Sequence, residues 1–269
     1  KRAGIFKKAA QLLTNEWRDT INAATMLSQS KNVFQAEIDA ACELIDFFNF
    51  NVQFAQEIYN NTELISPEDT LNYLQLRPLE GFIFAITPFN FTSIAANLPT
   101  APTLMGNVAI WKPASSSVYS GYFLMKMLQE AGLPDGVINF LPGSGAKIGN
   151  IVFDHQKLAG VHFTGSTKVF QDIWKKIGAN IANYDSYPRI VGETGGKDFI
   201  LAHETADIDA LVTAMIRGAF EYQGQKCSAA SRCYIPKSIW PEVKDKYTHL
   251  VNTIKVGDVN DFTNFVNSV

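Results

Sequence analysis

The chain has 269 residues, a mass of 29.8 kDa and a formal net charge of −3. Its 46% of hydrophobic residues can fill a sizeable core, and the slightly acidic balance excludes the basic footprint of a nucleic-acid-binding protein. No apolar run approaches the roughly 18–20 residues of a membrane span, so we expect neither a nucleic-acid nor a membrane partner. Three cysteines are too few for a disulfide framework and indicate a reducing compartment.

The N-terminal region, from Ile5 to about Ile58, has apolar residues at three- and four-residue steps and predicts helices. The first six residues read as the middle of an amphipathic helix, so we expect the chain to lack a natural N-terminus. Further on, Leu71–Leu76 alternates like an exposed strand.

Short apolar runs then alternate with helical stretches. Strands are predicted at Gly81–Ile86, Val108–Trp111, Val137–Leu141 and Gly160–Phe163, with a helix over Ser117–Ala131. This alternation indicates βαβ units and an α/β fold with a Rossmann-like, mostly parallel sheet flanked by helices. Ligands of such sheets bind beyond the carboxyl ends of the strands, so the turns there are where chemistry is expected.

A second block begins near residue 195. Strands are predicted at Phe199–Ala202 and Ser231–Ile235, and helices from Ile208 to Tyr222 and from about Ile239. We therefore expect two domains, residues 1–194 with a β arm near 65–80, and residues 195–269 as the start of a second α/β domain.

Two glycine-containing turns follow predicted strands and open predicted helices. The first spans Gly143 to Gly149 with spacing G-x-G-x-x-x-G, and the second contains Gly165 and Ser166. Glycine lets a phosphate approach the backbone, and Ser166 could cap a helix whose N-terminal amides favour anions. A plain tight turn or a helix cap without a ligand explains the same residues. Lys112, at a strand end, is either a ribose-binding lysine or simply solvated.

Three further side chains could carry chemistry. Glu193 follows a strand between glycines, where partial burial would raise its pKa toward that of a general base; helix capping or ion pairing is the alternative. Cys227 lies in a polar turn beside Lys226, whose charge would favour the nucleophilic thiolate. Asn90 follows a strand and could donate to an oxyanion, or only form a turn.

The other titratable side chains point less clearly to function. Cys42 and Cys233 are predicted to be core residues. None of the four histidines has the spacing of a metal site.

In combination these residues resemble the aldehyde dehydrogenase superfamily. The ordered matches are Pro88–Phe91, Trp111–Pro113, Phe163–Ser166, Glu193–Lys197 and Gly224–Cys227. Within the superfamily, Phe220–Ala229 and Ala36–Ala41 most resemble the Δ1-pyrroline-5-carboxylate dehydrogenases, also called L-glutamate γ-semialdehyde dehydrogenases. The resemblance covers the whole chain, whereas the family's chains are about twice as long, so the chain looks truncated at both ends.

The resemblance implies an NAD-dependent enzyme that oxidises L-glutamate γ-semialdehyde to L-glutamate in proline catabolism. Cys227 would attack the aldehyde, Asn90 and the Cys227 N–H would hold the oxyanion, and Glu193 would activate the water that opens the thioester. Residues 1–194 would be the NAD-binding domain and 195–269 the N-terminal part of the catalytic domain.

The resemblance also implies the binding residues. The cofactor would contact Ile86, Pro88, Lys112, Ser115, Gly145, Phe163, Gly165, Ser166, Thr194 and Gly195. Ser115 stands where the family has its NAD-selecting glutamate, so the residues alone do not separate NAD from NADP. Phe91 would wall the aldehyde tunnel, Ser228 would help hold the substrate's α-carboxylate, and Glu43 would lie near its amino end. A surface glutamate is the simpler account of Glu43.

Two alternatives stay open: another semialdehyde dehydrogenase of the superfamily, or an inactive nucleotide-binding fragment. Leu71–Leu76 resembles the family's dimerisation arm, so we expect a homodimer or higher homo-oligomer. The compartment would be the cytoplasm in a bacterium and the mitochondrial matrix in a eukaryote.

Overall fold

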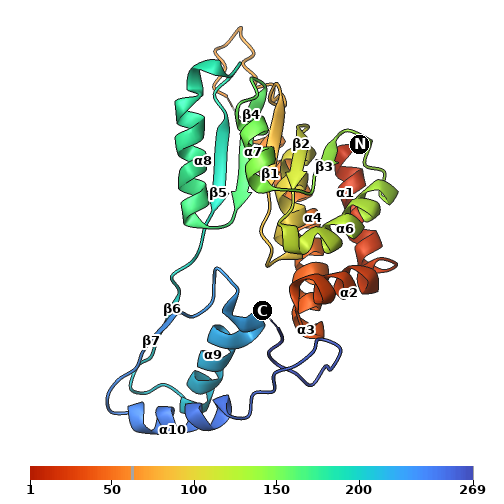
Figure 1. The fold of residues 1–269 in the computed structure, drawn as a ribbon. Coiled ribbons are helices and arrows are strands. Elements are labelled where there is room, and N and C mark those ends of the chain that lie inside the picture. The colour runs from red at the N-terminus through yellow and green to blue at the C-terminus, as the bar shows by residue number, and fades with distance from the viewer. Residues whose placement is uncertain (62–63, 269) are drawn as a thin grey trace.

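The computed structural model describes residues 1–61 and 64–268, and its central feature is a parallel sheet in the order β3-β2-β1-β4-β5 (Figure 1). Its strands are β1 (Phe82–Ile86), β2 (Val108–Lys112), β3 (Ile138–Phe140), β4 (Leu158–Thr164) and β5 (Arg189–Glu193). The four strands predicted by apolar runs are confirmed, and so is the α/β class.

The strand register brings several predicted site residues to one edge. Ile86 pairs with Lys112 on one side and with Phe163 on the other, while Thr164 pairs with Glu193. Because all of these strands are parallel, their carboxyl ends lie at the same edge of the sheet.

Helices cover both faces of this sheet. The N-terminal ones are α1 (Arg2–Thr14), α2 (Arg18–Gln29), α3 (Val33–Ala36), the π-helical turn η1 (Glu37–Glu43) and α4 (Leu44–Asn60). One core joins α1 and α4 to α5 (Thr92–Leu104), α6 (Val118–Glu130) and strands β2 and β3 around the buried Trp111. A second core packs α7 (Gly145–Phe153) and α8 (Thr167–Ala179) on β1 and β4 around Phe84 and Val161.

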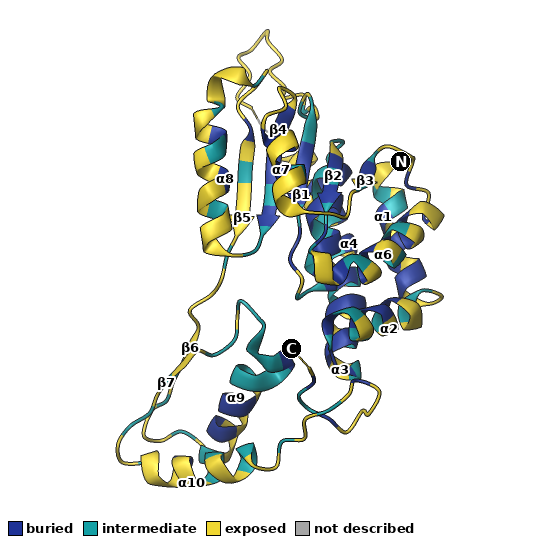
Figure 2. Ribbon diagram, in the orientation of Figure 1, coloured by how far each residue is buried: buried dark blue, intermediate teal, exposed yellow. Residues whose placement is uncertain are grey.

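The C-terminal part forms a smaller lobe. A two-stranded parallel sheet of β6 (Phe199–Leu201) and β7 (Arg232–Tyr234) packs with α9 (Ile208–Phe220) and α10 (Trp240–Val251). Figure 2 shows that its strands are more exposed than the central strands of the large sheet. The strands and helices predicted in this block are confirmed, although the first helix ends at Phe220 rather than at Tyr222. Residue 269 lies outside the described part.

The strand predicted at Leu71–Leu76 does not form within the single chain that the structure describes. Residues 64–80 form no strand, and Leu71 and Tyr73 are 80% and 73% exposed. Asn72 instead turns back locally, since its backbone N–H donates to Ser66 Oγ and its side chain to the carbonyl of Ile65. An alternating segment becomes a strand only when a neighbouring strand pairs with it, and no strand of the described chain lies beside it.

Within the described residues, every helix is too short or too polar to cross a bilayer.

Candidate active site

Two cavities open at the carboxyl edge of the large sheet. The helix-side cavity, about 510 Å³, is lined by residues of α4, α5, β4 and β5 together with Cys227 and Ser228. The strand-end cavity, about 680 Å³, is lined by the residues that follow β1, β2, β4 and β5 and by residues 224–227. Cys227 lines both cavities, so its thiol lies where they meet.

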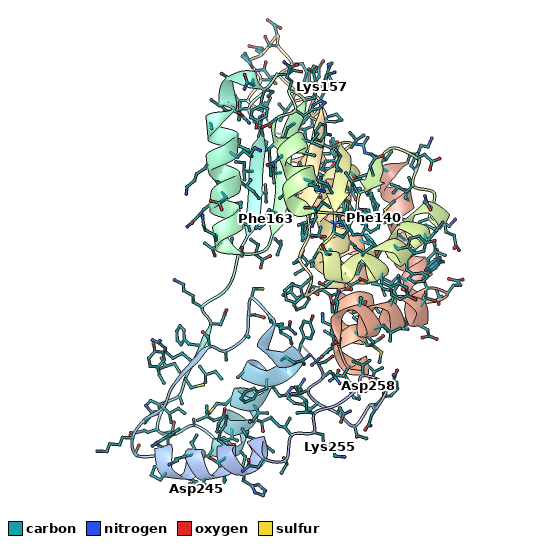
Figure 3. All side chains as sticks on the ribbon, viewed as in Figure 1. Phe140, Lys157, Phe163, Asp245, Lys255 and Asp258 are labelled. Atoms are coloured by element: carbon teal, nitrogen blue, oxygen red, sulfur yellow. The ribbon has the colours of Figure 1, made fainter. Side chains whose placement is uncertain are left out.

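The thiol turn, residues 222–228, follows the end of α9. Figure 3 shows this part of the smaller lobe reaching up toward the lower edge of the large sheet, below the labelled Phe163. Cys227 Sγ lies 3.6 Å from Glu193 Oε1. Burial and the nearby carboxylate raise the pKa of Cys227. The resting group is therefore a thiol with a proton acceptor at hand.

The expectation that Lys226 favours the thiolate is wrong. The Nζ of Lys226 lies 2.9 Å from Glu221 Oε1. The Lys226 charge is therefore paired with this carboxylate rather than with the Cys227 sulfur. Cys42 is also not a core residue, because it is exposed beside Arg18 and Glu37. Cys233 was predicted to be a core residue; it packs against the core of the smaller lobe but is half-buried.

Glu193 is the last residue of β5. Its side chain is exposed, so the prediction that this carboxylate is partly buried is wrong. The reason is that β5 is an edge strand, most of whose residues are exposed. The position at the cleft is nevertheless as expected, since Glu193 lines the helix-side cavity with Cys227.

Asn90 lies directly after β1 and contacts the thiol turn. Its Nδ2 donates a hydrogen bond of 2.9 Å to the carbonyl of Gln225. An amide group has two N–H bonds, so one remains to donate into the strand-end cavity, which Asn90 lines. This hydrogen bond connects the segment after β1 to the thiol turn, a contact that the sequence did not predict.

Gly196 lies against the backbone of the thiol turn. A Cβ added at this position would come within 1.6 Å of the Cys227 carbonyl oxygen. Only a residue without a side chain allows this approach. The β5 connection, residues 194–198 between β5 and β6, therefore packs directly against the backbone of the thiol turn.

Most of the predicted cofactor residues line the strand-end cavity. They are Ile86, Pro88, Lys112, Phe163, Gly165, Ser166, Thr194 and Gly195. Ser115 is placed elsewhere, in a separate surface hollow with Leu27 and Tyr119. Gly145 lies beside the strand-end cavity, because a Cβ built on it would be 3.6 Å from Lys112 Nζ.

The end of this cavity next to α8 suits an anion. Ser166 Oγ accepts the N–H of Val169 at 3.3 Å, so the predicted helix cap is confirmed. The N–H groups of Thr167 and Lys168 belong to the first turn, which has no intrahelical acceptors, and the positive end of the helix dipole lies there. Gly165 packs against the Phe163 ring, since a Cβ built on it would come within 2.7 Å of that ring.

Lys112 supplies a further donor to the strand-end cavity. Burial lowers the pKa of Lys112. Gly145 leaves the space on one side of Nζ open, since a Cβ built on it would lie 3.6 Å from that nitrogen. A lysine with room around its ammonium and a helix N-terminus in the same cavity fit a dinucleotide with hydroxyl and phosphate groups.

The helix-side cavity contains the three residues predicted to contact substrate: Glu43, Phe91 and Ser228. Glu43 is half-buried rather than on the surface, and its Oε2 lies 2.6 Å from Ser93 Oγ. Burial raises the pKa of Glu43. An acidic group, an aromatic wall and a hydroxyl thus share one cavity with the thiol.

His162 is a cavity residue that sequence reasoning missed. It lies on β4, its Nδ1 is 2.9 Å from the Leu98 carbonyl oxygen, and burial lowers its pKa. The available signal was a polar side chain inside an otherwise apolar strand. Among the described residues, no group of His, Cys, Asp or Glu could hold a metal ion.

The aldehyde dehydrogenase family model matches residues 1–269. This chain belongs to the aldehyde dehydrogenase family. Delta-1-pyrroline-5-carboxylate dehydrogenase, mitochondrial, of Dictyostelium discoideum is 53% identical over the whole chain, which covers 48% of that relative.

Solved structures confirm the fold. Delta-pyrroline-5-carboxylate dehydrogenase from Mycobacterium tuberculosis bound with NAD superposes with a TM-score of 0.97 at 52% identity, over the whole chain and 50% of that protein. 1-Pyrroline-5-carboxylate dehydrogenase from Thermus with bound NAD superposes with a TM-score of 0.93 at 31% identity, over 52% of that protein. This family member therefore spans about half the length of the relatives that it matches.

Proposed function

We propose that the chain carries the site for NAD-dependent oxidation of L-glutamate γ-semialdehyde, formed from Δ1-pyrroline-5-carboxylate, to L-glutamate in proline catabolism. The observation that carries this proposal is the Cys227 thiol, which lines two cavities of different chemistry and has Glu193 at 3.6 Å. The similar proteins from Dictyostelium, Mycobacterium and Thermus, all named for this activity, support the choice of substrate.

The helix-side cavity suits this substrate. Glutamate γ-semialdehyde has a cationic amino group and an anionic carboxylate at the end away from the aldehyde. Glu43 would pair with the amino group, and the Ser228 hydroxyl would donate to the carboxylate. The ring of Phe91 would exclude water from the carbon chain between them.

The strand-end cavity would hold NAD. Lys112 would donate to ribose hydroxyls, and the first turn of α8 with Gly165 and Ser166 would receive the pyrophosphate. Gly145 leaves room beside Lys112, while Thr194 and Gly195 line the end nearer the thiol. When bound, NAD supplies the acceptor for the hydride that the aldehyde carbon loses. The choice of NAD over NADP follows the NAD-bound relatives rather than Ser115, which lies outside this cavity.

The residues of the chain would perform the covalent steps. Glu193 takes the proton of the Cys227 thiol, and the thiolate sulfur bonds to the aldehyde carbon while the carbonyl electron pair moves to oxygen. Asn90 Nδ2 and the backbone N–H of Cys227 donate to that oxyanion. Loss of hydride from the same carbon leaves a thioester on Cys227.

Glu193 then acts a second time. It removes a proton from water, whose oxygen bonds to the thioester carbon, and the carbon–sulfur bond breaks to give the acid and the free thiolate. The exposed position of Glu193 allows it to exchange protons with solvent between the two steps.

The remaining proposals concern organisation. Residues 1–194 would form the NAD-binding domain and 195–269 the beginning of the catalytic domain, with the arm near 65–80 pairing with a strand of another copy in a homodimer or higher homo-oligomer. In a eukaryote we expect the mitochondrial matrix, as the name of the Dictyostelium relative suggests, and in a bacterium the cytoplasm.

The test compares substrates in steady-state turnover of the full protein. Wild type should reduce NAD faster than NADP with Δ1-pyrroline-5-carboxylate, and far faster than with propanal. Glu43→Gln should lower kcat/KM for the amino-bearing aldehyde by about 10–100-fold, the value of one hydrogen bond to a charged group, and leave succinate semialdehyde nearly unchanged.

Two outcomes would contradict the proposal. Preference for an aldehyde without the amino group would favour another semialdehyde dehydrogenase. Binding of NAD without turnover of any aldehyde would favour a nucleotide-binding fragment.

A further inference from the structure

Lys31 is a charged side chain enclosed in the protein and unused by the reaction described above. It lies between α2 and α3 and is 1% exposed, and its Nζ donates to Asp39 Oδ2 on η1, whose side chain is 2% exposed. A buried ion pair of this kind costs desolvation energy, so it stabilises the fold only if its further contacts are well made.

Asp39 makes those further contacts with the start of α5. Its two carboxylate oxygens accept the backbone N–H groups of Thr92 and Ser93 at 3.0 and 3.1 Å, and the Ser93 hydroxyl at 2.6 Å. Phe91 is the residue immediately before α5. The ion pair is therefore fixed to the segment that forms the wall of the helix-side cavity.

The ammonium group of Lys31 also contacts two aromatic rings. Its Nζ lies 4.1 Å from the ring centroid of Phe91 and 4.6 Å from that of Tyr222, within the range of cation–π attraction. One ring belongs to the cavity wall, whereas the other begins the thiol turn. A single buried cation thus joins the larger lobe to the segment that carries Cys227.

The backbone at Tyr222 is strained, so contacts of its side chain are required to stabilise this conformation. The φ angles of Tyr222, Gln223 and Gly224 are 52°, 55° and 69°, in the left-handed region that residues with a side chain rarely adopt. Tyr222 is fully buried, yet its hydroxyl has no hydrogen-bond partner among the described residues. The charged group that contacts this side chain is the Lys31 ammonium, over the face of its ring.

The strained backbone leads directly to the thiol. The N–H of Gln225 donates to the Tyr222 carbonyl at 2.9 Å, and the Gln225 carbonyl accepts Asn90 Nδ2 at 2.9 Å. A displacement of the Tyr222 ring would therefore move the segment that places Cys227 between the two cavities.

We propose that Lys31 is a positioning residue, whose ammonium group holds the Phe91 and Tyr222 rings together and so fixes the thiol turn. The proposal rests on the proposed function for its kinetic consequence, but the ordering of the thiol turn can be measured without any substrate.

A double-mutant cycle on the full protein tests the kinetic consequence. Tyr222→Leu should lower kcat per titrated thiol by about tenfold, and Lys31→Met, which also leaves the buried Asp39 without its ion-pair partner, by at least as much. The double variant should lose little more than Lys31→Met alone, because both changes remove the same contact between the Lys31 ammonium group and the Tyr222 ring. Tyr222→Phe keeps the ring and removes only the unpartnered hydroxyl, so it should retain wild-type kcat. Lys176→Met is the matched control, since Lys176 lies on α8 near Asp154 and the Phe153 ring, away from both cavities.

Hydrogen exchange tests the ordering itself. Peptides covering 222–228 should exchange at least about tenfold faster in Lys31→Met and in Tyr222→Leu, with peptides of α8 unchanged. Tyr222→Leu leaves the Lys31–Asp39 pair intact, so the test survives if Lys31→Met does not fold.

The proposal is overturned if the two effects on kcat multiply, if Tyr222→Leu exchanges like wild type, or if Tyr222→Phe is as impaired as Tyr222→Leu. Failure of the proposed function would look different, because wild type would then oxidise no semialdehyde while exchange in 222–228 still responded to Tyr222→Leu.

Discussion

The two cavities that meet at Cys227 are built in different ways. The strand-end cavity consists mainly of turns at the ends of parallel strands, where backbone N–H groups, glycines and one lysine face the open space. The helix-side cavity consists mainly of side chains from α4, α5 and the two strands β4 and β5, which are far apart in the sequence. The first presents generic features suited to a phosphate-bearing cofactor, and the second presents the particular groups that would choose a substrate.

The two constructions predict different effects of mutation. Changes in the strand-end cavity should alter cofactor affinity and leave the covalent chemistry in place. Changes in the helix-side cavity should alter the choice of aldehyde. Only changes to the residues where the two cavities meet should abolish the reaction itself.

Cys227→Ala is expected to have the largest effect, because it removes the nucleophile where the cavities meet. NADH formation with Δ1-pyrroline-5-carboxylate should fall by about 10⁴-fold or more, while NAD binding is retained. Cys42→Ala, the change of an exposed thiol outside both cavities, is the control and should behave as wild type. Unchanged NADH formation in Cys227→Ala would remove the basis of the mechanism.

Asn90→Ala removes the side-chain donor to the oxyanion. Loss of one such donor should lower kcat by about 10²–10³-fold, roughly 3–4 kcal/mol. Part of the loss would come from the missing hydrogen bond to Gln225, so the thermal unfolding temperature should be measured on the same sample. A kcat close to wild type would assign Asn90 to turn structure alone.

Gly196→Ala tests the fit between the β5 connection and the thiol turn. The new Cβ would overlap the Cys227 carbonyl oxygen, and a displacement of about 1 Å in a reacting group costs on the order of 10² in rate. Gly178→Ala on α8, where a Cβ meets no atom within 4 Å, is the control. Equal kcat values for the two variants would show that the thiol tolerates movement.

Lys112→Met should affect the strand-end cavity alone. Loss of a charged donor to the cofactor should raise the Kd for NAD by about tenfold or more. Alkylation of Cys227 by iodoacetamide should proceed as in wild type. If kcat at saturating NAD falls instead, Lys112 acts on the chemistry and the separation between the cavities fails.

Glu193→Gln offers the smallest but most direct electrostatic test. The carboxylate beside Cys227 raises the pKa of the thiol because a negative neighbour disfavours the thiolate. Removing that charge should shift the pH profile of Cys227 alkylation to lower pH. A profile that is unchanged or shifted to higher pH would mean that the two side chains do not interact in solution.

The strand-end cavity could largely be predicted from sequence because its signals are local. A short apolar run followed by glycine and serine predicts both a strand and the turn after it, as at Gly165 and Ser166. Ser115 is the exception, since its expected role came from a family position and the structure places it outside the cavity.

The helix-side cavity and the burial of its residues were harder to predict. The exposure of Glu193 depends on β5 being an edge strand, and the ion pair of Lys226 depends on Glu221 turning toward it. The buried Lys31 gives no local signal at all, because the sequence shows a lysine but not the rings that enclose it. Such features follow from tertiary packing between segments far apart in the chain.

Trapping the covalent intermediate shows directly whether Cys227 is the residue that attacks the aldehyde. Glu193→Gln should be mixed with NAD and Δ1-pyrroline-5-carboxylate, digested, and the peptides weighed by mass spectrometry. A glutamyl thioester on the peptide that contains Cys227 is the predicted result. Loss of the Glu193 charge lowers the pKa of the thiol, so a thiolate can still form by losing its proton to solvent and be acylated, whereas the water of hydrolysis has lost its base. An acyl group found only on Cys42 or Cys233, or on no cysteine although NADH has formed, would contradict the account.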